Sequence, residues 1–423
     1  MTDFEISMIF WKKKFYKLKH YIINFYNNLS KLRKHKVFRY INVNKVEEPI
    51  SLLTKAIGDL SFDAQCITNA AYDHFPMTSQ IILKSKKNDE YNTIEYYAAV
   101  ENTGSRFSGF EILELLDKRI AATIYKPQGW GIKGIEQVFA WRTLFLMECK
   151  KWFNKSKEPN LCDFFFRAND HFSEYSKYMF WTNVSIIDTK RGIINLCDTG
   201  YGQMYIFRNS QNNVDKIDLP INLFSVFSNS LLKESKYRYR DKLIKLNYGD
   251  ILVYINEGLL SNFRMVKYSN NKDEEMITEE FTENRIIEII NAVNSNSIYT
   301  LERITPDNGH ESFLFNFTNL EPSAKNTVLA ILAVERIFRL HPDPNDTSLY
   351  PVKIIPDIVE ILQKTLNNFN NFFSNRIDND YKHIYFSHLF EEGFLDDDPS
   401  AFAIKFFKDS KPSERYFIDG EEQ

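Results

Sequence analysis

Short apolar runs bounded by turn residues are the main pattern in the first and middle parts of this chain. Tyr96–Val100, Ile251–Ile255 and Ala401–Phe407 are rich in apolar and β-branched residues and have the length of buried strands. Three further short strands with turn signals between them predict an antiparallel meander, and a strand is also expected at Ser312–Phe317. The meander strands are Met179–Ile187, Gly192–Cys197 and Gln203–Phe207. Because the strands are not separated by regular helices, an α+β fold is expected.

Helical patterns occupy other stretches, some of them long. Residues 135–180 are rich in aromatic residues and predict helices with breaks near Pro159 and Asn169. The other predicted helices are Gly109–Ile124, the segment from Phe281 through Ala292, Thr327–Leu340 and Pro356–Phe373. Helices in these places would flank the predicted strands.

Two of the predicted strands end on a carboxylate followed closely by a glycine. Ile251–Ile255 runs into Asn256-Glu257-Gly258, and Tyr96–Val100 runs into Glu101-Asn102-Thr103-Gly104. A carboxylate at a strand end, beside a glycine that permits close approach of the backbone, suits a metal ligand or a catalytic acid. It also suits an ordinary turn with a solvated carboxylate. The repetition of the pattern favours convergence of Glu101 and Glu257.

Residues 1–45 differ in composition from the rest of the chain. Lysines and arginines alternate with aromatic residues there, and Phe15, Leu18, Ile22, Phe25 and Leu29 follow the spacing of an amphipathic helix. Three interpretations remain open. The segment is a helix on a membrane surface, a helical linker that pairs with a partner such as an upstream sensor or with a second copy of the chain, or a helix packed on its own domain.

Composition narrows the functional classes. The net charge of −3 predicts no general affinity for nucleic acid, and the chain has no Gly-x-x-x-x-Gly-Lys or Gly-x-Gly-x-x-Gly segment for a nucleotide. Cys66, Cys149, Cys162 and Cys197 form no Cys-x-x-Cys pair, so reduced thiols in a cytoplasmic protein are expected. No signal peptide is evident, and no apolar run reaches the roughly 18–20 residues of a membrane span.

Taken together, the ordered segments resemble the catalytic domain of the stage II sporulation protein E class of metal-dependent (PPM-type) protein phosphatases. Tyr96–Gly104 is similar to the family's Asp-Val-Ser-Gly segment, and Met179–Arg208 to its central meander. Asn247–Gly258 is similar to the block that runs from Gly-Asp to Thr-Asp-Gly, and Asp397-Asp398-Pro399-Ser400 to the closing Asp-Asp-x-Thr. The resemblance covers roughly residues 60–408. It predicts a phosphatase-like domain at 46–408 with a helical insertion at about 301–396, while composition alone sets off the basic segment at 1–45 and a polar tail at 409–423.

The resemblance implies two antiparallel sheets packed face to face and flanked by helices, an α/β/β/α sandwich. It further implies two Mg²⁺ or Mn²⁺ ions that activate a water for attack on a phosphoserine or phosphothreonine of a regulatory phosphoprotein. Hard oxygen ligands suit these ions.

The family's metal positions carry over unevenly. Glu101, Asn102 and Glu257 stand at ligand positions, the two glutamates where the family has aspartate, and Asp397 and Asp398 match the closing pair. The first acidic position is lost, because Ala70 stands there, while Asp73 is a possible additional acid. Mg²⁺ demands near-ideal octahedral geometry, so the longer ligands favour weak or Mn²⁺-dependent activity. The alternative is a pseudophosphatase, a binding or scaffolding module of bacterial signalling without catalysis.

Overall fold

We analysed the protein as a computed structural model of the 423-residue chain. The structure describes residues 76–87, 90–101, 108–115, 118–127, 132–153, 159–175, 180–200, 202–220, 224, 239–260, 263–270, 273–305, 309–339, 350–353, 356–370, 383–386 and 399–409. The predicted basic segment at 1–45 lies outside these residues.

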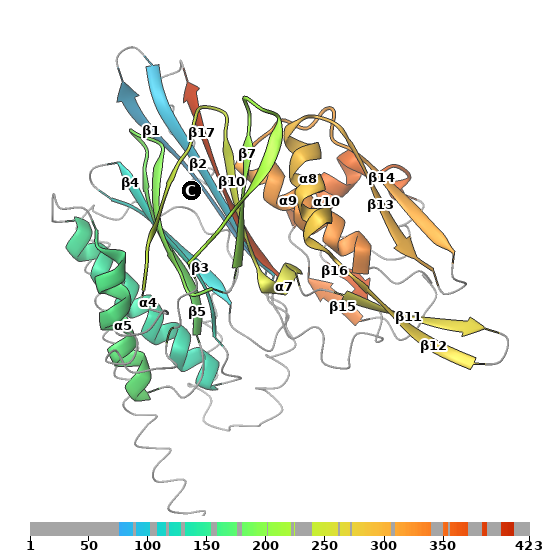
Figure 1. Cartoon of the computed structure of the whole chain (residues 1–423), viewed down its shortest axis with the longest axis horizontal. Helices are drawn as coiled ribbons and strands as arrows, with labels where there is room; N and C mark the ends of the chain where they lie inside the picture. The colour runs from blue at the N-terminus through green and yellow to red at the C-terminus, as the bar shows by residue number, and fades with distance from the viewer. Residues whose placement is uncertain are drawn as a thin grey trace, which may run out of the picture.

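Two antiparallel sheets form the centre of the molecule (Figure 1). The six-stranded sheet has the order β1-β2-β17-β10-β7-β8, and the five-stranded sheet has the order β3-β4-β5-β6-β9. The strands of the first sheet are β1 (Pro76–Lys87), β2 (Glu90–Glu101), β17 (Ser400–Asp409), β10 (Ile251–Asn256), β7 (Gly202–Arg208) and β8 (Asn213–Ile217). Those of the second are β3 (Gly109–Glu114), β4 (Arg119–Pro127), β5 (Phe180–Asp188), β6 (Ile193–Asp198) and β9 (Lys242–Lys245).

Alternation along the strands determines how the sheets pack. In β2, Tyr96 and Ala98 belong to the core between the two sheets, whereas Tyr97 and Ala99 belong to the core on the outer face of the six-stranded sheet. Successive strand residues point to opposite faces, so a strand that is apolar at every position is buried on both. Such double burial explains why these strands read as continuous apolar runs.

Helices cover both outer faces, giving four layers (Figure 1). Helices α4 (Ile132–Phe153) and α5 (Leu161–Tyr175) pack on the five-stranded sheet through a cluster rich in aromatic side chains. Helices α8 (Glu283–Asn294) and α9 (Ala324–Arg339) pack on the six-stranded sheet, and α10 (Pro356–Thr365) packs against α9, through mostly aliphatic side chains. The predicted α+β class, with two packed antiparallel sheets flanked by helices, is confirmed.

Three hairpins and a short helix complete the described elements. The hairpins are β11 (Phe263–Asn270) with β12 (Asp273–Glu280), β13 (Ile298–Ile304) with β14 (His310–Asn316), and β15 (Tyr350–Lys353) with β16 (His383–Phe386). The short helix α7 (Glu257–Leu260) follows β10 directly. The stretch predicted as a helical insertion at about 301–396 therefore holds strands as well as α9 and α10. None of the described helices combines the length and the apolar character that crossing a bilayer requires.

Three predicted helices need correction. The segment predicted as a helix at Gly109–Ile124 is the hairpin β3–β4, closed by a tight turn in which Lys118 has a φ of 65°. Pairing with β5 buries β4 along its whole length, and this non-local contact overrides the local helical spacing. Helix α5 runs through Asn169 without the predicted break, and α10 ends at Thr365 because Leu366 forms an isolated bridge with Phe315.

A candidate site at one edge of the six-stranded sheet

The site is built from the ends of three neighbouring strands. Strand β17 lies between β2 and β10 and is antiparallel to both, with Ser400 opposite Val100 and Ala401 opposite Ile255. The last residue of β2, Glu101, and the last residue of β10, Asn256, therefore reach the edge of the sheet at which β17 begins. Neighbouring strands lie about 4.8 Å apart, so two inter-strand steps separate the ends of β2 and β10 by about 10 Å.

Backbone pairing thus brings together the chain segments that carry the predicted ligands. Glu101 closes β2, Glu257 follows β10 as the first residue of α7, and Asp397 and Asp398 directly precede the described start of β17. The predicted convergence of the Glu101 and Glu257 segments is observed at the level of the backbone. Asp73, Asn102, Asp397, Asp398 and the lost position Ala70 lie outside the described residues.

Helix α7 determines how Glu257 is presented. Its Gly258 and Leu259 are buried, and Leu259 belongs to the core under the outer helices, whereas Glu257 is exposed. Next to it, the side-chain oxygen of buried Asn256 accepts a hydrogen bond from the Ser400 backbone N–H at 3.0 Å. This bond ties the end of β10 to the start of β17, so Asn256 serves structure while Glu257 faces solvent.

An aromatic stack holds the same three strands together close to their ends. The Phe402 ring of β17 lies between Tyr254 of β10 and Tyr96 of β2, with centroid distances of 5.0 and 5.3 Å. All three rings belong to the core between the sheets. Large rigid rings in contact limit how far the strand ends can move relative to one another.

A buried carboxyl group joins the two sheets at this edge. Asp198, the last residue of β6, is fully buried and accepts hydrogen bonds from the Tyr254 hydroxyl at 2.8 Å and the Gly200 backbone N–H at 2.6 Å. Asn183 of β5 donates a longer bond of 3.4 Å to the same carboxyl group. Asp198 therefore fixes the turn that leads from the five-stranded sheet into β7.

The turn continues into Gly202, where a side chain has no room. A Cβ atom at Gly202 would lie 2.1–2.4 Å from the ring and hydroxyl atoms of Tyr254. Gly202 is paired with Asn256 at the start of β7, so the turn and the end of β10 are packed as one unit.

Asp198 is not among the predicted site residues, although its sequence context carries a signal. The segment Asp198-Thr199-Gly200 has the same order of strand, carboxylate, small polar residue and glycine as the ends of β2 and β10. The turn residues of this segment indicate only a turn between β6 and β7. This carboxyl group is buried and accepts hydrogen bonds from donors of the chain itself, whereas Glu257 is exposed, so we assign Asp198 a positioning role.

The donor chemistry of the edge fits a hard divalent cation, because the segments that meet there carry carboxylates and no thiols. Among the described residues, no three His, Cys, Asp or Glu side chains form a group that could hold a metal ion. A complete ligand set would therefore need the acidic residues next to the described strand ends, Asp397 and Asp398 among them.

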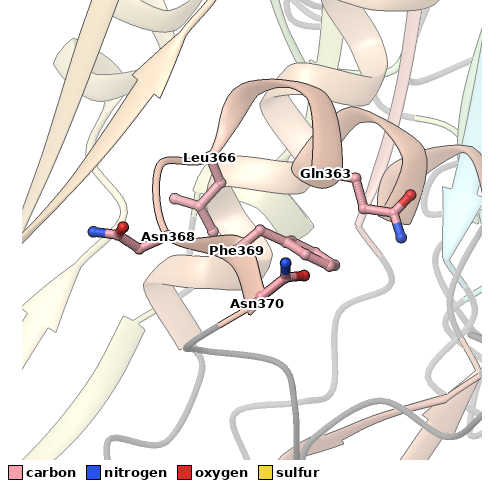
Figure 2. A pocket seen from close by; sticks show the side chains of 5 residues that line it. All are labelled: Gln363, Leu366, Asn368, Phe369 and Asn370. Carbon is pink, nitrogen blue, oxygen red and sulfur yellow. The ribbon is translucent and has the colours of Figure 1, made fainter.

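A pocket of about 510 Å³ lies elsewhere, at the end of α10 (Figure 2). It is lined by Gln363, Leu366, Asn368, Phe369 and Asn370. These side chains are amides and apolar groups, which do not titrate near neutral pH and provide no carboxylate for a metal. The sheet edge is thus the better candidate for hydrolytic chemistry.

No protein-family model matches the chain, and no characterised protein matches it in sequence. Solved structures are similar at low identity. The RsbU and RsbW domains of a Mycobacterium tuberculosis protein match 78% of this chain with 10% identity and a TM-score of 0.39, and this chain covers 61% of that one.

Two further structures come from other bacteria. The phosphatase domain of SpoIIE from Bacillus subtilis, with a fragment of its regulatory domain, matches 96% of this chain and is covered to 98% (10% identity, TM-score 0.35). The SiaA-PP2C domain of Pseudomonas aeruginosa matches 85% and is covered to 96% (10% identity, TM-score 0.37). PP2C phosphatase domains are therefore among the structural neighbours of the chain, and a likeness at this identity concerns the fold alone.

Proposed function

We propose that this chain is a metal-dependent, protein serine/threonine phosphatase-like protein whose reaction centre lies at the edge where β2 and β10 end and β17 begins. Its substrate would be a phosphoserine or phosphothreonine of a regulatory phosphoprotein. One observation carries the proposal: the position of β17 between β2 and β10. This strand order supports it, because it brings the end of β2, with Glu101, and the end of β10, next to Glu257, to the edge at which β17 begins, and Asp397 and Asp398 precede β17 in the sequence.

In this proposal the carboxylates of Glu101, Glu257, Asp397 and Asp398 hold Mn²⁺ or Mg²⁺, assisted by Asn102 and with Asp73 as an additional acid. When bound, such ions neutralise charge on the phosphoryl group and lower the pKa of an attacking water. Asn256, through its bond to Ser400, fixes the approach of two of the segments. No side chain acts as a nucleophile.

The alternative is a pseudophosphatase that binds a phosphoprotein or another partner of bacterial signalling without hydrolysing it. It is favoured by the ligand set itself, since Ala70 offers no ligand and two positions carry the longer glutamate. One additional methylene displaces a carboxylate oxygen by more than the Mg²⁺ site tolerates without backbone adjustment.

Calorimetric titration of the full chain with Mn²⁺ and Mg²⁺, followed by phosphate release from a phosphothreonine peptide, tests the proposal. We expect saturable Mn²⁺ binding and metal-dependent release, both lost in Asp397→Asn combined with Asp398→Asn. Glu360→Gln is the matched control, because Glu360 is an exposed carboxylate of α10. Metal binding without turnover would favour the pseudophosphatase, and no binding of either metal would refute the metal-dependent phosphatase.

A reversal experiment separates the two readings further. The variant Ala70→Asp, Glu101→Asp, Glu257→Asp restores the family's ligand types. If it hydrolyses the peptide while the parent does not, the parent is a degenerate phosphatase. Robust activity of the parent would exclude that alternative.

The basic segment at 1–45 remains a prediction, with contact to a membrane surface or an upstream sensor as its expected role. Cosedimentation with vesicles that contain anionic lipid tests the first of these. Sedimentation that is unchanged after deletion of residues 1–45 would remove the membrane role.

A further inference from the structure

Two cysteines far apart in the sequence meet beneath helix α5. Cys162 lies in the first turn of α5, and Cys197 lies near the end of β6, where it is fully buried. Their thiols share a side-chain hydrogen bond, and both residues contact the aromatic cluster between α5 and the five-stranded sheet. Neither is in a disulfide.

The two thiols differ in a way that suits consecutive chemical steps. Cys162 is partly exposed, and its sulfur accepts hydrogen bonds from the Cys197 thiol and from the Asp241 backbone N–H. These bonds, the Cys197 bond above all, lower the pKa of the Cys162 thiol against the opposing effects of burial and of the Asp241 and Asp163 carboxylates. Burial, first of all, raises the pKa of Cys197, which therefore stays protonated.

The position of Cys162 at the start of α5 also favours its thiolate. Asn160 caps α5 by accepting a hydrogen bond from the Asp163 backbone N–H at 3.0 Å, so Cys162 lies among the first N–H groups of a 15-residue helix. The positive end of a helix stabilises a thiolate, and low-pKa, accessible cysteines are the ones that react with peroxides.

We propose that Cys162 and Cys197 form a peroxide-sensitive dithiol that closes an internal disulfide between α5 and β6. The Cys162 thiolate attacks one oxygen of hydrogen peroxide, the O–O bond breaks, and the released hydroxide takes up a proton to give water and Cys162 sulfenic acid. The Cys197 thiol then loses its proton and attacks the sulfenic sulfur, and the S–O bond breaks to release a second water. Two thiols are oxidised by two electrons in total, and one peroxide is reduced.

The disulfide would also affect the sheet edge described above, through the residue that follows Cys197. A disulfide bond of about 2.05 Å in place of the hydrogen bond would link α5 covalently to β6. Cys197 directly precedes Asp198, whose carboxyl group fixes the turn into β7. This inference does not depend on phosphatase activity and can be tested without it.

Peptide mapping of the full, natively folded chain tests the proposal. The chain is treated with hydrogen peroxide, its remaining thiols are alkylated, and the digest is analysed by mass spectrometry. We expect a cross-linked peptide pair that contains Cys162 and Cys197 and disappears on reduction. A Cys162→Ser variant should give no such pair, whereas Cys149→Ser, which changes a buried cysteine of the same aromatic cluster, should still give it.

Two further measurements decide the order of steps. With N-ethylmaleimide at neutral pH, native Cys162 should react at least about tenfold faster than Cys149 or Cys197. Cys197→Ala should accumulate a sulfenic acid at Cys162 that a dimedone probe traps. A disulfide of Cys162 with Cys66 or Cys149, or a Cys162 that goes on to sulfinic acid in the parent chain, would overturn the proposal. If Cys197→Ala fails to fold, the mapped cross-link of the parent chain still decides it.

Discussion

The two ends of strand β10 carry the same pair of residue types, a carboxylate beside a glycine, and use it for different purposes. At the start of the strand, Gly249-Asp250 forms a turn with Gly249 at a φ of 89°. The Asp250 carboxylate is 1% exposed and accepts bonds from Arg208 Nη1 at 2.8 Å, Asn247 N at 2.9 Å and Asn209 N at 3.2 Å. These three partners belong to the turn or to the neighbouring end of β7, so this carboxylate holds the turn against β7.

At the other end of β10, Asn256, Glu257 and Gly258 have different roles. Asn256 and Gly258 are buried and serve packing, while the Glu257 side chain is exposed at the edge where three strand ends meet. A carboxylate enclosed by the donors of its own chain has its hydrogen-bonding capacity used for stability. An exposed carboxylate at a convergence of strand ends can be reached from solvent, so sequence likeness alone does not separate the two roles.

The largest effect expected is on stability, from Asp250→Ala. The variant removes a buried acceptor from Arg208 and from two backbone N–H groups, and the loss of hydrogen bonds to a charged group costs about 3 kcal/mol of the free energy of unfolding. Urea unfolding measures it. Asp215→Ala is the matched control, because Asp215 contacts the same Arg208 at 3.5 Å but is 45% exposed, and we expect a change below about 0.5 kcal/mol. Equal losses in the two variants would contradict a structural role specific to Asp250.

The next largest effect is expected from Glu257→Gln, which should lower activity and leave stability nearly unchanged. We expect Mn²⁺-dependent phosphate release to fall at least about 100-fold, equivalent to about 2.7 kcal/mol of transition-state stabilisation. The free energy of unfolding of the metal-free chain should change by less than about 0.5 kcal/mol, as is usual at exposed positions. A large loss of stability with unchanged metal binding would make Glu257 a structural carboxylate of the Asp250 kind.

The contrast also shows which parts of the fold can be predicted from the sequence. Strands β2, β10 and β17 were predicted because runs that are apolar on both faces have few other interpretations. The hairpin β3–β4 was mistaken for a helix because its identity depends on pairing with β5, a contact that local spacing does not report. The repeated strand-end pattern favours convergence of Glu101 and Glu257, but the strand order that brings their segments to one edge depends on long-range pairing that no local periodicity reports.

The candidate site was predicted less completely. The strand-end carboxylates Glu101 and Glu257 were found because each precedes a glycine, yet Asp198, with the same pattern, was taken for an ordinary turn. What distinguishes Asp198 is its burial and its bond from Tyr254, which is 56 residues away in the sequence. A contact of that separation leaves no trace in a local pattern. Asp397 and Asp398 were identified by the resemblance alone and remain predictions.

A smaller effect is expected from Tyr254→Phe, which removes the bond that joins the two sheets at the site end of β10. The Tyr254 hydroxyl donates to Asp198 at 2.8 Å in a buried setting, and the loss of such a bond to a carboxyl group costs about 2 kcal/mol. The phenylalanine ring preserves the stack on Phe402. Urea unfolding gives the cost, and calorimetry gives the effect on Mn²⁺ binding.

The two measurements together test the positioning role of Asp198. We expect Tyr254→Phe to weaken Mn²⁺ binding in addition to lowering stability, because the turn and the end of β10 pack as one unit. Tyr205→Phe is the matched control. Tyr205 is also a buried tyrosine, its hydroxyl bonds to Gln203, and its ring lies in the core on the other face of the sheet. If both variants lose stability and neither changes metal affinity, Asp198 and Tyr254 are part of the general core only.

The smallest effect is expected from Glu360→Gln, an exposed carboxylate placed where no strand ends converge. Glu360 accepts a bond from Lys364 at 2.5 Å one helical turn away, and both side chains are more than half exposed. That bond lowers the pKa of Glu360, so its contribution to stability is present above the unfolded-state pKa of about 4.3 and is lost as the pH falls through the lower folded-state pKa. Solvent screening keeps this contribution below about 0.5 kcal/mol at neutral pH. Urea unfolding at pH 7 and pH 3 should therefore show parent and variant nearly equal at both values, with the parent's small advantage confined to pH 7. A stability advantage of the parent that persisted at pH 3 would rule out the ion pair as its source. A loss of Mn²⁺ binding in Glu360→Gln would show that exposure alone, without convergence of strand ends, accounts for any effect seen at Glu257.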